Sequence, residues 1–231
     1  MTGRAEANPL SGPARTLVFP SVLSADFARL GDDARAAMSD GGDGLHVDVM
    51  DGHFVPNLSM GPVVCEAIHR AVPGAFLDVH LMVTDPARWI DAFARAGAGH
   101  LQFHAEVVPD PCAMARAIHD AGMTAGIVIN PGTPAEACFG ALGCVETVML
   151  MSVHPGRSGQ AFIPEVLAKA PAIASRLRPG QRIMLDGGVS PSNAAACRAA
   201  GCSVLIGGSA IFGSPDRAAA IAGMRGPAPR P

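Results

Sequence analysis

The chain has 231 residues, of which 49% are hydrophobic, and its formal net charge is −3. This length and composition can build one sizeable core, so we expect a single domain. The sequence shows no cluster of basic residues, which argues against nucleic-acid binding. The apolar runs are only as long as strands, which argues against a membrane span.

Strand-length apolar segments recur along the whole chain, and most are apolar on both faces, as buried parallel strands are. The predicted strands are Leu17–Leu23, Leu45–Val49, Phe76–Met82, His100–His104, Thr124–Ile129, Thr147–Val153, Arg182–Leu185 and Ser203–Ile206.

Ala-rich segments of helical length separate these strands, and most begin with Pro while several end at Gly. The predicted helices are Asp26–Ser39, Pro62–Ala71, Pro86–Ala96, Pro111–Ala121, Pro164–Leu177, Pro191–Ala200 and Pro215–Ala222, with a poorer helical pattern at Pro134–Leu142.

Eight strand–helix units without an insertion favour an α/β fold, a (β/α)8 TIM barrel in a single domain. A doubly wound open sheet is the alternative, but no Gly-x-Gly-x-x-Gly turn follows the first strand. We predict the barrel at 17–224, a flexible leader at 1–16 without an apolar signal core, and a disordered tail at 225–231.

Six cysteines are scattered along the chain without a Cys-x-x-Cys pair, which argues against a structural zinc site or a redox motif. Their even number would allow disulfides. Because the chain is large and shows no secretion signal, we predict reduced, mostly buried thiols in a cytoplasmic protein.

Polar residues gather at the predicted carboxyl ends of the strands, where TIM barrels carry their active sites. They are Ser21, Ser24, His46, Asp48, Asp51, His80, His104, Glu106, Asn130, Ser152, His154, Asp186 and Ser209. The remaining histidines, His53, His69, His100 and His119, fall outside this pattern and are expected in loops or at the surface.

Four of these residues predict a metal site. Alternation in a strand places His46 and Asp48 on one face, and His80 and Asp186 end other strands. Buried ionisable groups are costly unless they are paired or bind a metal. Two imidazoles with carboxylates suit one divalent ion: Zn, Mn, Fe or Co.

Methionines and glycines complete the predicted pocket. Met50 and Met82 share the face of the histidines, and with Met151 they would form a dry collar, although Met also serves as core filler. Gly187–Gly188 and Gly208–Ser209 lie in loops that often bind phosphate in barrels. The loop 154–160 could cover the same anion as a lid.

The chain resembles the ribulose-phosphate 3-epimerase family in several segments, which follow the family order from about residue 17 to 213. They are Pro20–Phe27, His46–Asn57, Asp78–Val83, Asn130–Pro131, Leu150–Val153, Leu185–Val189 and Gly208–Phe212.

The resemblance implies a metal-dependent 3-epimerase that interconverts D-ribulose 5-phosphate and D-xylulose 5-phosphate through an enediolate. It implies that Asp48 and Asp186 are the acid–base pair and that they bind the metal together with His46 and His80. It further implies that Ser21 contacts the ketose phosphate and that the Gly187–Gly188 and Gly208–Ser209 backbones hold its phosphate. We also expect a homo-oligomer.

The covering loop departs from the family, which usually has Asn-Pro-Gly-Phe-Gly-Gly-Gln where this chain has His154-Pro-Gly-Arg-Ser-Gly-Gln160. Arg157 replaces an aromatic residue and Ser158 a glycine, between Gly156 and Gly159. Arg157 either faces solvent or adds a cation near the phosphate, and the pocket could be reshaped for another sugar phosphate.

Three alternatives follow. The substrate could be another ketose phosphate such as D-allulose 6-phosphate, or the barrel could bind phosphate without catalysis. A decarboxylase of similar fold would be expected to carry a Lys near the carboxylates, whereas the only Lys, Lys169, falls in a predicted helix.

Overall fold

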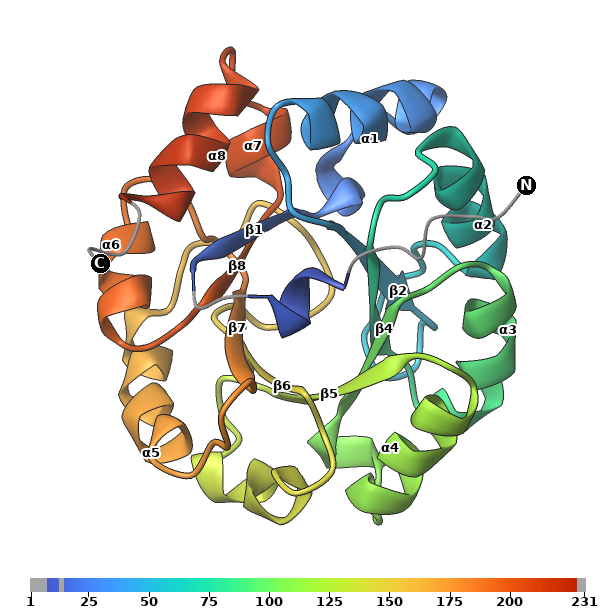
Figure 1. Cartoon of the computed structure of the whole chain (residues 1–231), viewed down its shortest axis with the longest axis vertical. Coiled ribbons are helices and arrows are strands. Elements are labelled where there is room, and N and C mark those ends of the chain that lie inside the picture. Colours follow the sequence, from blue (N-terminus) through green and yellow to red (C-terminus); the bar gives the residue numbers. More distant parts are fainter. Residues whose placement is uncertain (1–7, 13–14, 228–231) are drawn as a thin grey trace.

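The computed structural model describes residues 8–12 and 15–227 and shows one barrel of eight parallel strands (Figure 1). The strands are β1 (Leu17–Pro20), β2 (Leu45–Met50), β3 (Leu77–Met82), β4 (His100–His104), β5 (Thr124–Ile129), β6 (Thr147–Met151), β7 (Arg182–Asp186) and β8 (Val204–Gly207). They pair in the order β1-β8-β7-β6-β5-β4-β3-β2, and a parallel bridge between Ser21 and His46 brings β1 to β2. The predicted (β/α)8 fold is confirmed.

The α-helices form a ring around the strands (Figure 1). They are α1 (Leu30–Ser39), α2 (Pro62–Ala71), α3 (Ile90–Arg95), α4 (Pro111–Asp120), α5 (Ala170–Ala174), α6 (Ala194–Ala199), α7 (Ser209–Phe212) and α8 (Arg217–Arg225). Asp110 and Asp216 cap α4 and α8 by accepting backbone N–H bonds, which satisfies donors that the first turn leaves free.

Several segments are 3-10 helices, both in connections and in the first turns of segments predicted as α-helices. These are Val22–Ser24, Phe27–Arg29, Pro86–Trp89, Ala105–Val107, Ala135–Ala141 and Pro164–Lys169. The turn at Val22–Ser24 ends β1 at Pro20, three residues before the predicted end of that strand. The segment Pro134–Leu142, which has the poorer helical pattern, contains a 3-10 helix at Ala135–Ala141 and no α-helix.

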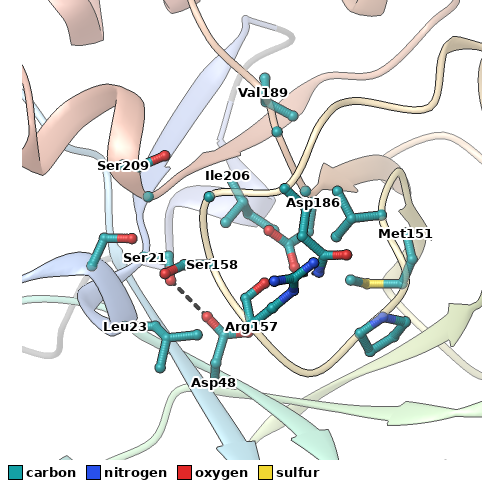
Figure 2. A pocket seen from close by; sticks show the side chains of 18 of the residues that line it. Ser21, Leu23, Asp48, Met151, Arg157, Ser158, Asp186, Val189, Ile206 and Ser209 are labelled. Atoms are coloured by element: carbon teal, nitrogen blue, oxygen red, sulfur yellow. Dashed lines mark hydrogen bonds between the residues drawn. The ribbon is translucent and has the colours of Figure 1, made fainter. Parts of the chain in front are cut away.

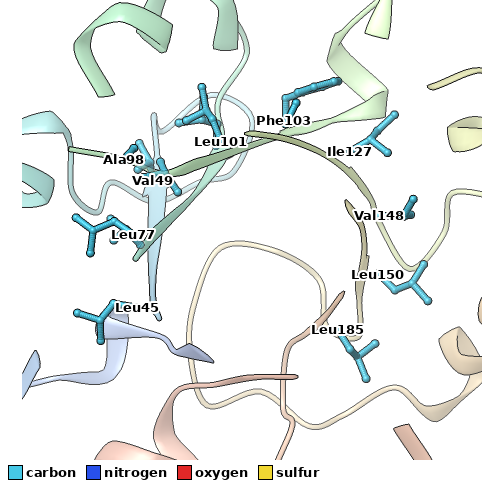
Figure 3. Packing of buried hydrophobic residues seen from close by; sticks show 14 of the residues in the cluster. Leu45, Val49, Leu77, Ala98, Leu101, Phe103, Ile127, Val148, Leu150 and Leu185 are labelled. Carbon is cyan, nitrogen blue, oxygen red and sulfur yellow. The ribbon is translucent and has the colours of Figure 1, made fainter. Parts of the chain in front are cut away.

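Strand alternation divides the buried side chains into two layers. Residues such as Val49, Leu77, Leu101 and Phe103 point outward and pack under the helices (Figure 3). A second cluster, which includes Phe19, Met149 and Met184, fills part of the barrel interior. Because the helices cover the outer face, the inward face of the barrel is free to carry polar residues.

The segment before β1 packs against the barrel. Pro9–Ser11 forms a 3-10 helix that crosses the centre of the ring in Figure 1, and Leu10 is buried. The guanidinium of Arg182 donates to the carbonyl oxygens of Leu10, Gly12 and Arg15 at 2.8, 2.9 and 3.1 Å. These residues belong to the predicted leader; residues 1–7 and 13–14, like residues 228–231 of the predicted tail, lie outside the part described.

The cysteines differ from the prediction in one pair. Cys65, Cys138, Cys197 and Cys202 are free and buried, but Cys112 and Cys144 form a disulfide. The prediction of reduced thiols throughout is therefore wrong for this pair, whose Cα atoms lie 5.4 Å apart at the start of α4 and before β6. Within the described part of the chain, no helix is long and apolar enough to cross a membrane.

Candidate active site

A cavity of about 270 Å³ opens at the carboxyl ends of the strands (Figure 2). Every residue for which we predicted substrate contact lines it. They are Ser21, Met50, Met82, Met151, Gly156, Arg157, Ser158, Gly159, Gly187, Gly188, Gly208 and Ser209. Asp48 and Asp186 also line the cavity, so the loops and the predicted acid–base pair meet in one place.

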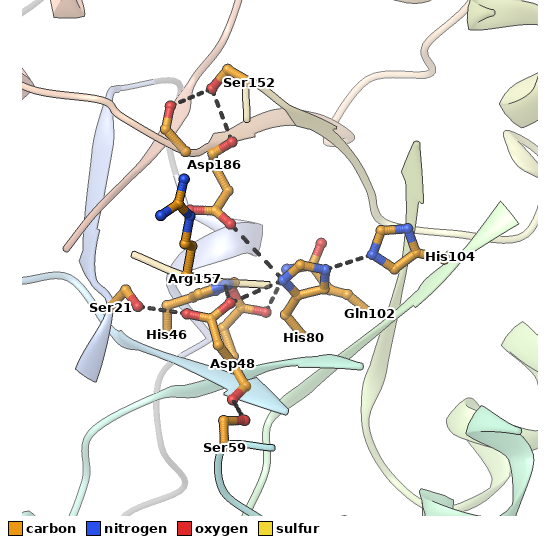
Figure 4. Close-up of polar contacts among 12 residues, drawn as sticks. Ser21, His46, Asp48, Ser59, His80, Gln102, His104, Ser152, Arg157 and Asp186 are labelled. Carbon is orange, nitrogen blue, oxygen red and sulfur yellow. Dashed lines mark hydrogen bonds and ion pairs between the residues drawn. The ribbon is translucent and has the colours of Figure 1, made fainter. Parts of the chain in front are cut away.

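The four predicted metal ligands converge beneath this cavity (Figure 4). One ligand atom from each of His46, Asp48, His80 and Asp186 lies within 4.8 Å of the others. The register explains the convergence, because Asp48 on β2 is paired with His80 on β3. His46 is two residues before Asp48 on the same strand, and Asp186 ends β7 on another wall.

The His46 ring is oriented by a carboxylate behind it. Its Nδ1 lies 2.7 Å from Asp78 Oδ2, and the amide of Gln102 donates to Asp78 Oδ1 at 2.8 Å. The Nε2 atom of His46 is buried without a hydrogen-bond partner and lies 3.2 Å from Asp48 Oδ1. A carboxylate that accepts from one ring nitrogen of a histidine leaves the other nitrogen as a metal ligand.

His80 faces the cluster with Nδ1, whereas His46 faces it with Nε2. Its Nδ1 lies 3.1 Å from Asp48 Oδ1 and 3.9 Å from Asp186 Oδ2. Ser21 donates from Oγ to the second oxygen of Asp48 at 2.6 Å, so this carboxylate is held from two sides. The backbone oxygen of Asp186 accepts from Ser152 Oγ at 2.9 Å, which fixes the end of β7.

The surroundings of Asp48 and Asp186 shift the pKa values of the two carboxyl groups in opposite directions. Burial disfavours the charge of Asp48, but the imidazoles of His46 and His80 outweigh burial and hold the pKa of Asp48 well below its usual range. Burial and then the charge of Asp48 raise the pKa of Asp186 to about 7. Two carboxylates with pKa values moved apart in this way are suited to opposite roles in proton transfer.

The cluster fits a divalent metal ion. Burial opposes protonation of His46, but Asp48 and Asp78 raise its pKa well above the usual value, so the carboxylates draw positive charge to this spot. The Nε2 atom of His46 makes no hydrogen bond and lies 3.2 Å from Asp48 Oδ1, so it faces the place that a cation would occupy. A donor set of two imidazole nitrogens and two carboxylates is typical of a borderline divalent ion.

The predicted methionine collar lies above these ligands. Met50 and Met82 are register partners on β2 and β3, and Met151 ends β6. All three are at most 5% exposed and line the cavity. Their soft side chains keep the wall beside the ligands apolar.

Two glycine turns bring the loops close to one another. Gly187 and Gly188 have φ values of +111° and +64°, which favour glycine. A Cβ atom at Gly188 would lie 2.8 Å from the backbone nitrogen of Phe162. The Gly187–Gly188 turn therefore packs directly against the chain that follows the covering loop.

The covering loop over the cavity is held by side-chain amides that donate to its backbone carbonyl oxygens. The amide of Gln160 donates to the carbonyl oxygens of His154 and Arg157 at 2.7 and 2.9 Å. Asn57, in the loop after β2, donates to Gly156 O at 2.8 Å. Arg157 points into the cavity near Asp186 (Figures 2 and 4). Asn57 ends the His46–Asn57 segment but was not among the predicted site residues.

Other residues of the polar ring have structural contacts instead. The carboxylate of Asp51 accepts from the backbone nitrogens of His53, Phe54 and Thr84, each at 2.8 Å. His104 is fully buried behind His80 and does not line the cavity.

One histidine prediction is wrong. His100 is not at the surface: it is fully buried on β4, where its two nitrogens lie 2.8 Å from the hydroxyls of Thr124 and Thr147. Its alternation with Gln102 and His104 places it inside the barrel, and this spacing is visible in the sequence.

Comparisons with known proteins agree with the geometry of the site. Residues 17–212 match the model of the ribulose-phosphate 3 epimerase family. A ribulose-phosphate 3-epimerase from Mycobacterium bovis is 45% identical, and the match covers 95% of this chain and 94% of that protein. One from Bacillus subtilis is 43% identical over 90% of this chain and 98% of that protein.

Solved structures share the fold at low identity. A crystal structure of KGPDC from Streptococcus mutans has a TM-score of 0.69 and 13% identity, and the match covers 91% of this chain and 95% of that one. This likeness supports the barrel alone, whereas the sequence matches identify relatives. The chain belongs to the ribulose-phosphate 3-epimerase family.

Proposed function

We propose that this protein is a metal-dependent 3-epimerase that interconverts D-ribulose 5-phosphate and D-xylulose 5-phosphate. One observation carries the proposal: two carboxylates, the buried Asp48 on β2 and the partly buried Asp186 on β7, flank one cavity and share a metal-donor set with His46 and His80. Membership of the epimerase family and the names of the relatives support the same reaction.

The reaction requires removal of a weakly acidic proton. The C3–H bond of a ketopentose phosphate is α to the carbonyl group, and a planar enediolate forms when the proton leaves. A divalent ion bound by His46, Asp48, His80 and Asp186 would supply Lewis acidity that stabilises the negative charge of this enediolate. The cofactor in the proposal is therefore one ion, chosen among Zn, Mn, Fe and Co.

The two aspartates act on opposite faces of the substrate. Asp48 and Asp186 approach the cavity from different strands, so one can remove the C3 proton from one face while the other delivers a proton to the opposite face. In the reverse direction the two residues exchange roles. Because they interact closely, their titration belongs to the pair.

The loops bind the other parts of the substrate. The backbones of Gly187–Gly188 and Gly208–Ser209 are proposed to hold the phosphate, and Arg157 adds a positive charge beside it. Met50, Met82 and Met151 would exclude water from the enediolate, which protects it from stray protonation. Ser21 keeps Asp48 oriented and faces the substrate.

Assembly and location belong to the same proposal. We propose a homo-oligomer, and Leu58 and Val63, which are 74% and 78% exposed, are candidates for its interface. A sugar phosphate is charged and does not cross membranes unaided, so we place the enzyme in the cytoplasm with its substrate. Light scattering on purified protein measures the oligomeric state.

The test is a sugar-phosphate panel with metal-reconstituted protein. Stripped protein is reloaded with each of the four ions and assayed with the phosphates of ribulose, allulose and tagatose. Asp48→Asn and Asp186→Asn should each lower kcat by at least about 100-fold, the scale of general acid–base catalysis. Asp91→Asn, an exposed change on α3, serves as the control, and the metal content of each variant is measured.

Solvent deuterium gives an independent readout. The wild-type product should carry deuterium at C3, and a variant that keeps the base on one face should still exchange the C3 hydrogen of one epimer. Near-normal epimerisation by either aspartate variant would refute its role. Preference for allulose 6-phosphate would favour the alternative substrate, and an inactive metal-loaded wild type would indicate a non-catalytic barrel.

A further inference from the structure

A second imidazole lies directly behind His80. The Nε2 atoms of His80 and His104 are 2.9 Å apart, and both rings are fully buried (Figure 4). The Nδ1 atom of His104 lies 3.2 Å from Glu106 Oε2. A continuous row of polar atoms therefore runs from the carboxylate of Glu106 through two imidazoles to the metal cluster.

The chemistry of this row assigns its protons. An ionised carboxylate can only accept hydrogen bonds, so His104 must donate to Glu106 from Nδ1. In a neutral imidazole ring with its proton on Nδ1, the other nitrogen has no proton. The Nε2 of His104 is then an acceptor, and the proton between the two Nε2 atoms belongs to His80.

This assignment leaves the Nδ1 lone pair of His80 facing the carboxylates of Asp48 and Asp186, 3.1 and 3.9 Å away. A lone pair beside two carboxylate oxygens is repulsive unless a cation lies between them. The other tautomer, with its proton on Nδ1, would donate to Asp48 and block metal binding. Glu106 and His104 oppose that tautomer.

We propose that Glu106 and His104 are positioning residues that select the Nε2–H tautomer of His80 and so present its Nδ1 to the metal ion. The inference rests on the proposed metal-dependent function. It mirrors the arrangement at His46, where Asp78 accepts from Nδ1 and leaves Nε2 free. The two metal-binding histidines thus use opposite nitrogens, each set by an acidic partner behind it.

Glu106 is well held for this task. Its other oxygen accepts from the backbone nitrogen of Asn130 at 2.9 Å and from the hydroxyl of Thr133. The ammonium of Lys169 donates to the carbonyl oxygens of Asn130, Pro131 and Thr133, which fixes the turn that holds Glu106. Lys169 thereby has a structural task outside the cavity lining.

The decisive variant is Glu106→Gln, which keeps the shape of the side chain. Because one oxygen must still accept from Asn130 and Thr133, the new NH2 group faces His104 and donates to it. His104 then carries its proton on Nε2, and His80 is driven to the blocking tautomer. Removal of the outer partner of a metal-binding histidine weakens metal binding roughly 10- to 100-fold, and we expect a loss in this range.

The matched control is Thr133→Val, which removes a hydrogen bond from the other oxygen of Glu106 and leaves the contact with His104. Affinity for Zn²⁺ and Co²⁺ is measured by competition with a chelator on stripped protein, and the Co²⁺ absorption spectrum reports the ligand set. We expect Thr133→Val to bind both ions within about threefold of wild type, a small effect beside that expected for Glu106→Gln.

A direct measurement covers the case in which Glu106→Gln does not fold. Nitrogen NMR of wild-type protein labelled in histidine should show His104 protonated on Nδ1 and bare at Nε2. A proton on Nε2 of His104, or equal metal affinity of folded Glu106→Gln and wild type, would overturn the inference. If wild type itself bound no metal, the proposed function would fail instead.

Discussion

The disulfide between Cys112 and Cys144 is expected to make a large contribution to stability. The two residues are 32 positions apart in the chain. In the loop-entropy model, a bridge that closes a loop of this length stabilises the folded state by about 4 kcal/mol, because it restricts the unfolded chain. For a protein of this size, that corresponds to a melting temperature higher by roughly 8–16 °C.

The measurement compares urea unfolding of oxidised and reduced protein, followed by far-UV circular dichroism. Reduction should lower the free energy of unfolding by about 4 kcal/mol, and the Cys112→Ala/Cys144→Ala variant should behave like the reduced protein. Thiol titration of the native protein should find accessible thiols only after reduction, since the four other cysteines are buried. Neither bridged cysteine lines the active-site cavity, so kcat at 25 °C should not change.

Two results would refute this reasoning. An unchanged thiol count after reduction would mean that the bridge does not form. A bridge that forms but changes the free energy of unfolding by less than about 1 kcal/mol would mean that restriction of the unfolded chain does not govern its effect.

Two further predictions concern the covering loop and the loop after β2. Arg157→Phe should raise KM for the sugar phosphate roughly tenfold with little change in kcat, because a guanidinium–phosphate hydrogen bond is lost; an unchanged KM would place Arg157 outside phosphate binding. Burial disfavours the charge of Asp51, but hydrogen bonds from Thr84, His53 and Phe54 lower its pKa to about 2 from 3.8. A folded-state pKa below the unfolded value means that this stabilisation is complete above about pH 4 and is lost as the pH falls through 2. Asp51→Asn should therefore be less stable than wild type at pH 7 and converge with it in acid, as followed by urea unfolding; a constant difference between pH 7 and pH 2 would contradict the assignment.

The fold could be predicted from sequence wherever the hydrophobic periodicity and the Gly and Pro residues at element ends indicate the same boundary. The bounds of β4, β5 and α2 coincide with the prediction; Gly99 directly precedes β4, and Gly61 and Pro62 mark the start of α2. The 3-10 turns were missed because their hydrogen bonds depend on how short loops fit onto the barrel. The disulfide was missed because the distance between Cys112 and Cys144 depends on how α4 packs beside the following connection.

The sequence allowed prediction of the residues that face the cavity and the metal, but not of the residues that lie behind them. Strand parity placed His46, Asp48 and His80 on the inner face, and the same parity marks Asp78, Gln102 and His104 as their inward neighbours. That second signal is present in the sequence, but the prediction of the metal site does not include it. The pairing of His46 with Asp78 also depends on the register of β2 against β3, which no single strand reveals.

The 3-10 helix at Pro9–Ser11 bears on how the protein can be shortened. A recombinant version begun at residue 17, where the family match starts, would remove the three carbonyl oxygens that receive the guanidinium of Arg182. A cation only 5% exposed would then lose these acceptors at the floor of the barrel. A dependable expression unit is therefore longer than the span that matches the family model, and its extra residues close the end of the barrel opposite the catalytic mouth.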